Sequence, residues 1–270
     1  MNNPGKLLIR LTAVLVLSLL ITATAQAGSV KAADAQPEVT TVSAEPGALT
    51  PQDDWVSALV AGGTVILGPG EFRTDRTVEL EHSVTVRGVG SDDTHLLFNS
   101  DGGLYGEQLV LLGSGPERQR FEFAGLSVST ENETVSDLMV AIGNLHLVLS
   151  GVSVCCSWDD LEAYYDPEDG AWWGIGLILG EGTTAYFERS EFNVNGMHGI
   201  AAFNADRVTV VDSLFSYNWW SGIYADNTNL TVTGSTFEFN DVGIEVVGEG
   251  NRVFARNTFE GQEYEDIYEW

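Results

Sequence analysis

Lysine is almost missing from this sequence, and after residue 27 only Lys31 is present. The chain has 12 basic and 39 acidic residues. Without Lys6 and Arg10, which precede a leader-like segment, the charge is 10 − 39 = −29. Such a charge excludes nucleic acid as a natural partner, because phosphate binding needs a cationic face. Two interpretations of the acidity stay open: a surface that attracts cations such as Ca²⁺, or the general acidic composition of salt-tolerant proteins.

Cysteine is also scarce, with Cys155 and Cys156 as the only two, side by side in the chain. Adjacent cysteines cannot join distant segments, and a disulfide between them is expected to be strained. The sequence therefore predicts no disulfide framework. A redox role is not indicated, because the Cys-x-x-Cys spacing is absent.

Long apolar runs are absent apart from Leu11 to Ile21, which follows two cations and precedes Ala25-Gln26-Ala27. This pattern predicts a signal peptide over residues 1–27. The run is short for a bilayer span, and no later stretch could cross a membrane. We therefore expect a secreted protein (extracellular, periplasmic or in the cell envelope), monomeric and without a stable membrane span after cleavage.

Residues 28–50 lack hydrophobic periodicity and predict a flexible linker. A helix is expected next, with Thr50 as N-cap and Pro51 in its first turn. Its apolar face comprises Trp55, Leu59 and Val60, and Gly62-Gly63 ends it. A short amphipathic helix ahead of many strand patterns indicates an end cap for a domain spanning residues 51–270.

A repeat then occupies the C-terminal half. Phe192, Phe215, Phe237 and Phe259 close similar phrases at spacings of 23, 22 and 22 residues. A period near 22 with three short strands predicts one coil of a parallel β-helix, in which equivalent residues stack about 4.8 Å apart.

The opening strands carry a family resemblance. The runs GTVILGPGEF from Gly63 and VTVRGVG from Val84, after a capping helix, resemble the first coils of the pectate-lyase-like right-handed β-helix superfamily. The resemblance implies an all-β fold, a single right-handed parallel β-helix with three short strands per coil.

The period assigns several columns to the inside of the helix. Besides the phenylalanines, we expect a second apolar stack, an asparagine ladder at tight left-handed bends, and a further polar column. These sets are Ile175, Ile200, Ile223 and Ile244; Asn195, Asn218 and Asn240; and Ser190, Ser213, Ser235 and Asn257.

The period breaks once, between Val154 and Phe192, where 38 residues include about 16 more than one coil. The excess predicts a loop insertion at 155–170, where binding and catalysis tend to concentrate. Its acids are candidates for catalysis or for an optional Ca²⁺ site, although they match no Ca²⁺-loop signature. A solvated acidic flap is the alternative. The catalytic candidates are Asp159, Asp160 and Asp166, and the metal candidates are Asp166, Glu168 and Asp169.

Tryptophan pairs lie next to this loop in the predicted stacking. Trp172-Trp173 and Trp219-Trp220 precede glycines of successive coils and are candidates for sugar stacking, since an indole presents a flat apolar face. His198 lies between them as a candidate general acid or base. The alternatives are that one tryptophan of each pair belongs to the core and that His198 is structural.

The resemblance does not extend to one enzyme. Polygalacturonases of the superfamily carry Asn-x-Asp, Asp-Asp, Gly-His-Gly and Arg-x-Lys, of which this chain has Asp159-Asp160 and His198-Gly199, with Met197 in place of the first glycine. We therefore predict a β-helix that binds, and in its enzymatic form cleaves, an extracellular polysaccharide as a hydrolase or lyase, with no certain cofactor. The rival is a non-catalytic structural or adhesive protein.

Overall fold

The computed structural model describes residues 47–99, 107–130, 137–157 and 174–270. They all belong to one compact unit, Val42–Trp270. The predicted signal peptide and nearly all of the linker lie outside the described residues. Within the described part, no helix has the length and apolar character that crossing a membrane requires.

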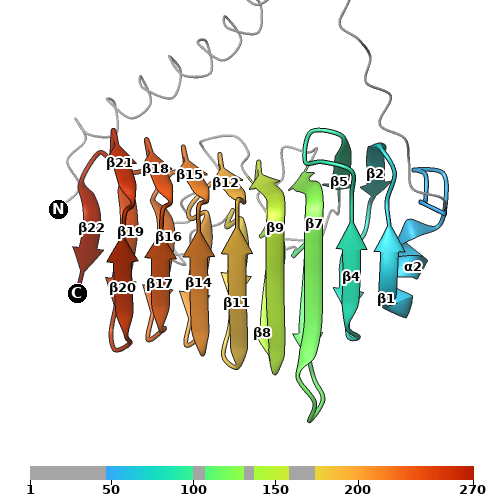
Figure 1. Ribbon diagram of the computed structural model, residues 1–270, viewed down its shortest axis with the longest axis horizontal. Helices are drawn as coiled ribbons and strands as arrows, with labels where there is room; N and C mark the ends of the chain where they lie inside the picture. The colour runs from blue at the N-terminus through green and yellow to red at the C-terminus, as the bar shows by residue number, and fades with distance from the viewer. Residues whose placement is uncertain (1–46, 100–106, 131–136, 158–173) are drawn as a thin grey trace, which may run out of the picture. The chain divides into compact units, whose positions relative to one another are not determined.

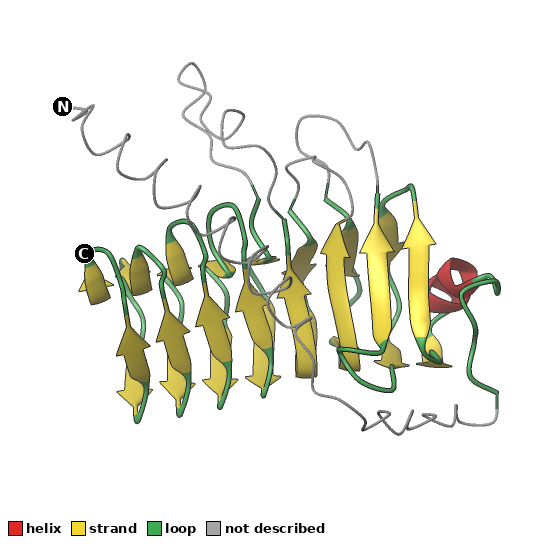
Figure 2. Cartoon of the chain, turned by 90° about the horizontal axis from the view of Figure 1, so that it is seen from above, coloured by secondary structure: helices red, strands yellow, loops and turns green. Residues whose placement is uncertain are grey.

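Helix α2 (Trp55–Ala61) lies at the N-terminal end of the strands (Figures 1 and 2). Its N-cap is Asp54, whose side chain accepts a hydrogen bond from the Ser57 amide at 3.1 Å. The prediction that Thr50 caps the helix is wrong, because Thr50 instead donates to the carboxylate of Asp53. Gly62 ends the helix at a φ of 76°, as expected.

The helix packs its apolar face on the first coil. The structure buries Trp55, Val56 and Leu59, whereas Val60 is 45% exposed, so its predicted place on the buried face is wrong. Trp55 makes edge-to-face contact with Phe72 and Phe98 of the core. The predicted capping role is thus met by three side chains that cover the interior of the first coils.

Within the described residues, 22 strands form two parallel sheets (Figure 1). One has eight strands and supplies the first strand of each coil; its members pair only with their counterparts in neighbouring coils. Its strands are β3 (Val78–Leu80), β6 (Leu109–Gly113), β8 (Met139–Gly143), β10 (Leu177–Leu179), β13 (Ile200–Phe203), β16 (Ser221–Asp226), β19 (Val242–Val247) and β22 (Glu265–Glu269).

The other sheet has 14 strands and contains the second and third strands of each coil. The second-strand column is β1 (Gly63–Ile66), β4 (Val84–Arg87), β7 (Gln119–Thr130), β9 (Leu145–Cys155), β11 (Thr183–Glu188), β14 (Arg207–Val211), β17 (Leu230–Thr233) and β20 (Arg252–Ala255). The third-strand column is β2 (Gly70–Thr74), β5 (Thr94–Phe98), the later parts of β7 and β9, β12 (Glu191–Asn193), β15 (Leu214–Ser216), β18 (Thr236–Glu238) and β21 (Thr258–Glu260).

A left-handed residue separates the second and third strands in each of six coils. In β7 and β9 it is a glycine, Gly125 or Gly151, and the strand continues through the bend. Later coils use a full break, and their bend residue need not be glycine. These later residues are Arg189, Asp212, Gly234 and Arg256.

The predicted phenylalanine stack is confirmed. Phe192 pairs with Phe215, Phe215 with Phe237, and Phe237 with Phe259 in register. Their rings lie 5.1, 4.8 and 5.0 Å apart and nearly parallel. Since the first three are fully buried, the stack forms part of a continuous core along the helix.

The second apolar stack is correct for three of its four predicted members. Ile200, Ile223 and Ile244 align, but Leu177 rather than Ile175 pairs with Ile200. Gly176, not Gly174, takes the position of Gly199 in this register, and at both Gly176 and Gly199 an added Cβ would lie 2.7 Å from the next coil's carbonyl oxygen.

The asparagine ladder is present inside the third bend of the coils. Asn195 Nδ2 donates to Asn218 Oδ1 at 2.9 Å, and Asn218 Nδ2 donates to Asn240 Oδ1 at 2.9 Å. The left-handed backbone, however, belongs to the preceding residues Val194 and Tyr217, and to Phe239 before Asn240. The asparagines are held inside, where their amides satisfy buried main-chain groups. The polar column of Ser190, Ser213, Ser235 and Asn257 is confirmed by amide-to-side-chain bonds of 3.0 to 3.2 Å.

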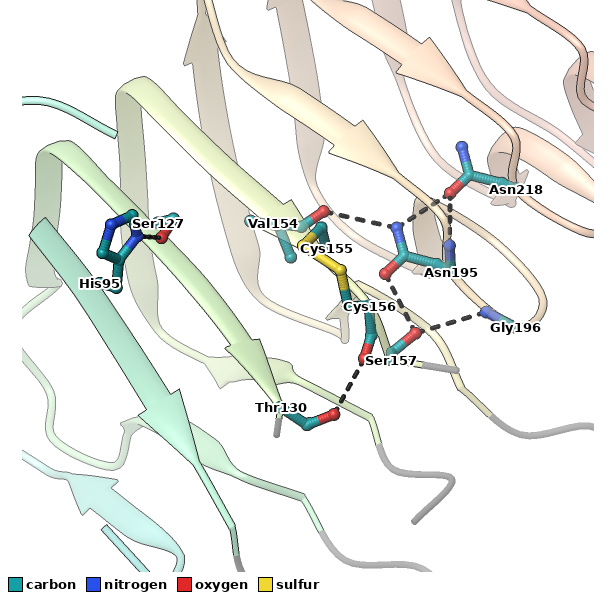
Figure 3. The surroundings of a disulfide bond; sticks show 10 residues. All are labelled: His95, Ser127, Thr130, Val154, Cys155, Cys156, Ser157, Asn195, Gly196 and Asn218. Carbon is teal, nitrogen blue, oxygen red and sulfur yellow. Dashed lines mark hydrogen bonds between the residues drawn. A yellow bond between two sulfur atoms is a disulfide. The ribbon is translucent and has the colours of Figure 1, made fainter. Parts of the chain in front are cut away.

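The adjacent cysteines are joined. Cys155 and Cys156 form a disulfide at the end of β9, and this bond joins neighbours and no distant segments, as the sequence predicts (Figure 3). The neighbouring backbone is fixed by hydrogen bonds: Thr130 Oγ1 donates to the Cys156 carbonyl at 2.9 Å, and Ser157 Oγ lies 3.0 Å from Asn195 Oδ1. The asparagine ladder therefore extends to Ser157, which falls within the predicted insertion at 155–170.

We predict that Asn218→Ala lowers the free energy of unfolding by about 2–4 kcal/mol, because the Asn195 amides and the Phe192 carbonyl lose buried partners. Urea unfolding followed by circular dichroism measures it. Asn229→Ala is the matched control: its side chain accepts from Asn251 and donates to the Asp206 carbonyl at exposed positions. Water can replace those bonds, so its cost should stay below about 1 kcal/mol. Equal losses for both variants would contradict a buried ladder.

Candidate functional site

A hollow of about 300 Å³ opens on the outer face of the eight-stranded sheet. Its position follows from strand alternation, because Ile200, Ile223 and Ile244 point inward and their neighbours point outward. The lining comes from β13, β16, β19 and the turns before β13 and β16. It consists of Met197, His198, Phe203, Trp220, Tyr224 and Glu245.

His198 forms one wall and is almost fully buried. Its Nδ1 lies 2.5 Å from Ser221 Oγ, and its ring stacks on Tyr224 with 5.1 Å between centroids. Burial lowers the pKa of His198 to about 3. The imidazole is therefore neutral at physiological pH, and it has no imidazolium proton to give as a general acid.

Trp220 and Glu245 form a second wall. The Trp220 Nε1 donates to Glu245 Oε2 at 2.7 Å, and the Trp270 Nε1 donates to Glu245 Oε1 at 3.2 Å. Two indoles thus hold one buried carboxylate between neighbouring coils. This arrangement fixes the Trp220 ring at the edge of the hollow, where it also approaches Tyr264 at 6.3 Å.

Several aromatic residues of this face were missed by the sequence interpretation. Tyr224 is paired with Glu245 in register, and Glu245 with Tyr268, so they form one outward column. Phe203 contacts Tyr224 at 5.5 Å. The signal was available in the sequence, because each residue lies an odd number of positions from an inward isoleucine.

The register changes the predicted tryptophan edge. Trp220 donates a hydrogen bond through its backbone amide to the Met197 carbonyl, and Ser221 is the residue that faces His198, so Trp220 is equivalent to Met197 and not to His198. Trp219 is half-buried and does not line the hollow. Ile175 has the position equivalent to His198 in the preceding coil.

Seven predicted site residues lie outside the described residues. They comprise the three catalytic candidates of the loop, the remaining metal candidates and the first tryptophan pair: Asp159, Asp160, Asp166, Glu168, Asp169, Trp172 and Trp173. The described residues that flank them, Ser157 and Gly174, are joined by a 2.5 Å hydrogen bond from Ser157 Oγ to the Gly174 carbonyl. Elsewhere in the described ranges, no group of three or more His, Cys, Asp or Glu side chains is arranged to hold a metal ion.

Asp137 is a carboxyl group that the sequence interpretation did not single out. Its Oδ1 accepts a hydrogen bond from the Ile175 amide at 2.9 Å. Burial, with a smaller contribution from the charge of Glu107, raises the pKa of Asp137 to about 6. Register places Asp137 two coils before His198, at about 10 Å along the axis.

Comparison with known proteins supports the fold. A family model described as "Right handed beta helix region" matches residues 170–268. Solved structures that resemble the chain include the Dettilon tailspike protein, at a TM-score of 0.47 and 15% identity, covering 77% of this chain and 46% of that chain. The chain thus spans about half the length of the tailspike. None of the curated protein sequences matches it.

Two further likenesses are weaker. The A-module of the Azotobacter vinelandii mannuronan C-5 epimerase AlgE4 has a TM-score of 0.30 and 13% identity, with coverage of 83% of this chain and 97% of that one. The catalytic domain of a GH87 α-1,3-glucanase, solved with nigerose, has a TM-score of 0.30 and 11% identity, with coverage of 87% and 67%. With the family model and the parallel strand register, the chain is a right-handed parallel β-helix protein.

The low pKa of His198 predicts a specific pH dependence of stability. Its ordinary value is 6.5, so between about pH 6.5 and pH 3 the unfolded chain binds a proton that the folded chain does not. The free energy of unfolding is therefore unaffected by this ring above pH 6.5, and below that value it falls by up to about 1.4 kcal/mol per pH unit. The variant His198→Gln lacks the titrating ring but keeps every carboxylate. The difference between its stability and that of the wild type at each pH therefore measures the contribution of His198 alone. Parallel stability curves for the two proteins from pH 7 to pH 4 would refute a neutral buried ring.

Proposed function

We propose that the protein is secreted, acts as a monomer and binds an extracellular polysaccharide in the hollow of the eight-stranded sheet. The observation that carries the proposal is the convergence of Phe203, Trp220 and Tyr224 on one opening, with Glu245 held between coils. Aromatic rings present apolar faces to the C–H faces of sugars, and a carboxylate oxygen with a remaining lone pair accepts a sugar hydroxyl.

The exposed aromatics favour a chain that runs along the axis. Beyond the hollow toward the C-terminus, Tyr264 is 41%, Tyr268 38% and Trp270 71% exposed. Successive coils are about 4.8 Å apart, which is close to the length of one sugar ring. A glycan parallel to the axis could therefore meet a new aromatic edge at each residue. Since the described lining has one carboxylate and no cation, a neutral or cationic glycan fits best.

A cleaving form of the protein would depend on the inserted loop. The neutral, buried His198 does not support general acid catalysis. Asp159, Asp160 or Asp166 would then act as general acid and general base. Asp166, Glu168 and Asp169 are the proposed ligands of an optional Ca²⁺. Without such activity, the same hollow would serve a non-catalytic adhesive or structural protein.

The binding proposal predicts that Trp220→Ala weakens glycan binding by at least tenfold, since it removes the stacking face and one partner of Glu245. A glycan array followed by calorimetry on the best ligand measures the loss. The control is Phe239→Ala, which removes an aromatic of 47% exposure that stacks on Tyr217 away from the hollow. If Trp220→Ala binds as tightly as the wild type, the hollow is not the site.

The cleaving form predicts that the wild type releases reducing or unsaturated ends from a bound polysaccharide. The triple variant Asp159→Asn/Asp160→Asn/Asp166→Asn should lose that release while it still binds. Addition of EDTA tests the optional Ca²⁺, whose removal should abolish release if the ion takes part. A wild-type protein that binds without releasing ends would establish the non-catalytic alternative.

A further inference from the structure

A second groove, of about 570 Å³, lies on the outer face of the 14-stranded sheet across β7, β9, β11 and β14. Three of the ten arginines of the sequence line it: Arg118, Arg120 and Arg207. Its other described lining side chains include His146, Thr184 and Tyr186, and none is a carboxylate. In a chain with 39 acidic residues, a groove of this composition is the reverse of the overall charge.

The register explains how the cations meet. Arg120, His146, Thr184 and Arg207 have equivalent positions in four successive coils and face outward. Coil spacing sets Arg120 and Arg207 about 14 Å apart along the axis. The row therefore presents a cation at each end, with two hydrogen-bonding side chains between them.

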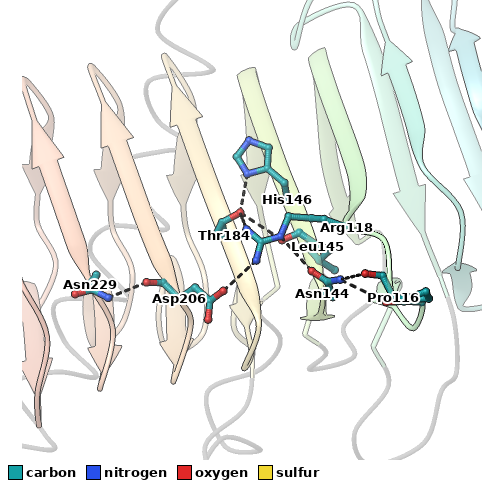
Figure 4. A network of polar contacts seen from close by, with 9 residues as sticks. Pro116, Arg118, Asn144, Leu145, His146, Thr184, Asp206 and Asn229 are labelled. Atoms are coloured by element: carbon teal, nitrogen blue, oxygen red, sulfur yellow. Dashed lines mark hydrogen bonds and ion pairs between the residues drawn. The ribbon is translucent and has the colours of Figure 1, made fainter.

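Arg118 is fixed over this row (Figure 4). Its guanidinium donates to Asn144 Oδ1 at 3.1 Å and to Thr184 Oγ1 at 3.4 Å, and it pairs with Asp206 at 3.2 Å. Asn144 in turn donates to the carbonyl of Pro116 at 3.2 Å, which holds the turn that carries Arg118. The cation is thus positioned before any ligand arrives, which lowers the entropy that binding costs.

The two ends of the row differ in their partners. Arg120 pairs with Glu122 beside the groove. The Arg207 guanidinium makes no hydrogen bond or ion pair with the residues that the structure describes. Burial, followed by the charge of Arg120, lowers the pKa of His146, which favours the neutral ring between the cations. Its Nδ1 lies 2.8 Å from Thr184 Oγ1.

We propose that this groove binds a linear acidic polysaccharide, with its carboxylate or sulfate groups at Arg120 and Arg207 and Arg118 above them. A single small anion cannot reach both ends of a row of about 14 Å, whereas a polymer with repeated charges can. At physiological ionic strength charges are screened within about 8 Å, so the remote acids of the chain oppose binding only weakly. The near carboxylates Asp206 and Glu122 already pair with Arg118 and Arg120, and an acidic glycan has to share or displace these partners. The site is separate from the aromatic hollow and does not depend on its function.

The test is calorimetry of the full chain with polygalacturonate, dextran sulfate and uncharged dextran. The acidic glycans should bind, more weakly as salt rises, and dextran should not; the tighter of the two identifies carboxylate or sulfate. Arg120→Gln/Arg207→Gln should weaken the tighter glycan about 100-fold, at about tenfold per lost charge-assisted contact. The charge-matched control Arg73→Gln/Arg256→Gln, away from the groove, should change affinity less than twofold.

Three results would overturn the proposal. They are equal binding by the groove variant and the control variant, equal binding of dextran, and tighter binding of an oligonucleotide of similar length.

Hydrogen exchange of the wild type provides a second test that needs no variant and therefore stays valid if a variant misfolds. The acidic glycan should protect the backbone amides of residues 118–120, 146, 184–186 and 207–209. Protection over Met197 to Tyr224 instead would place the ligand in the aromatic hollow and refute the groove. Trp220→Ala should leave the affinity for the acidic glycan unchanged, because Trp220 lines the aromatic hollow and not the groove. This variant therefore distinguishes a failure of the groove proposal from a failure of the proposed glycan binding in the hollow.

Discussion

The strict register between successive coils is the constraint on which the structure depends. Each strand pairs in parallel with its counterpart one coil away. The direct neighbours of a residue are therefore the equivalent residues of the preceding and the following coil. Phe192, Phe215 and Phe237 stack because backbone hydrogen bonds hold their Cα atoms in line, and the rings then exclude water along the axis. Buried asparagine amides hold the same register at the bends.

This constraint also organises the outer surface. Since side chains alternate across a strand, a column of outward positions is as regular as a column of core positions. One such column on the eight-stranded sheet places Tyr224 beside Glu245 and Tyr268, within an aromatic face. Another on the 14-stranded sheet places Arg120, His146 and Arg207 in a cationic row. A rigid scaffold thus presents two faces of different chemistry without an added domain.

Charge distinguishes these two faces more than shape does. The aromatic hollow has one carboxylate, which two indoles satisfy, whereas the described lining of the arginine groove has none. Net charge describes long-range attraction and repulsion, but screening limits its reach, so ligand preference depends on the nearest groups. A chain with strongly negative composition can therefore carry a local cationic site.

By itself the sequence determined the period, the phenylalanine stack, the two polar ladders and the interruption of the repeat between Val154 and Phe192. The first three features recur in several coils, so the period can be counted more than once, and the interruption is measured against that period. Single local choices were less secure. The doublets Gly174-Ile175 and Gly176-Leu177 are both compatible with the pattern, and only the strand register, which pairs Leu177 with Ile200, decided between them.

The tertiary structure alone decided the candidate sites. Period counting placed His198 and Trp220 near one edge, but it gave neither the burial that keeps His198 neutral nor the bond from Trp220 to Glu245. The arginine groove escaped notice because its members are 87 residues apart, from Arg120 to Arg207, across an insertion that disturbs the count. Proximity between distant residues is a property of packing, and a sequence fixes it only where the repeat is unbroken.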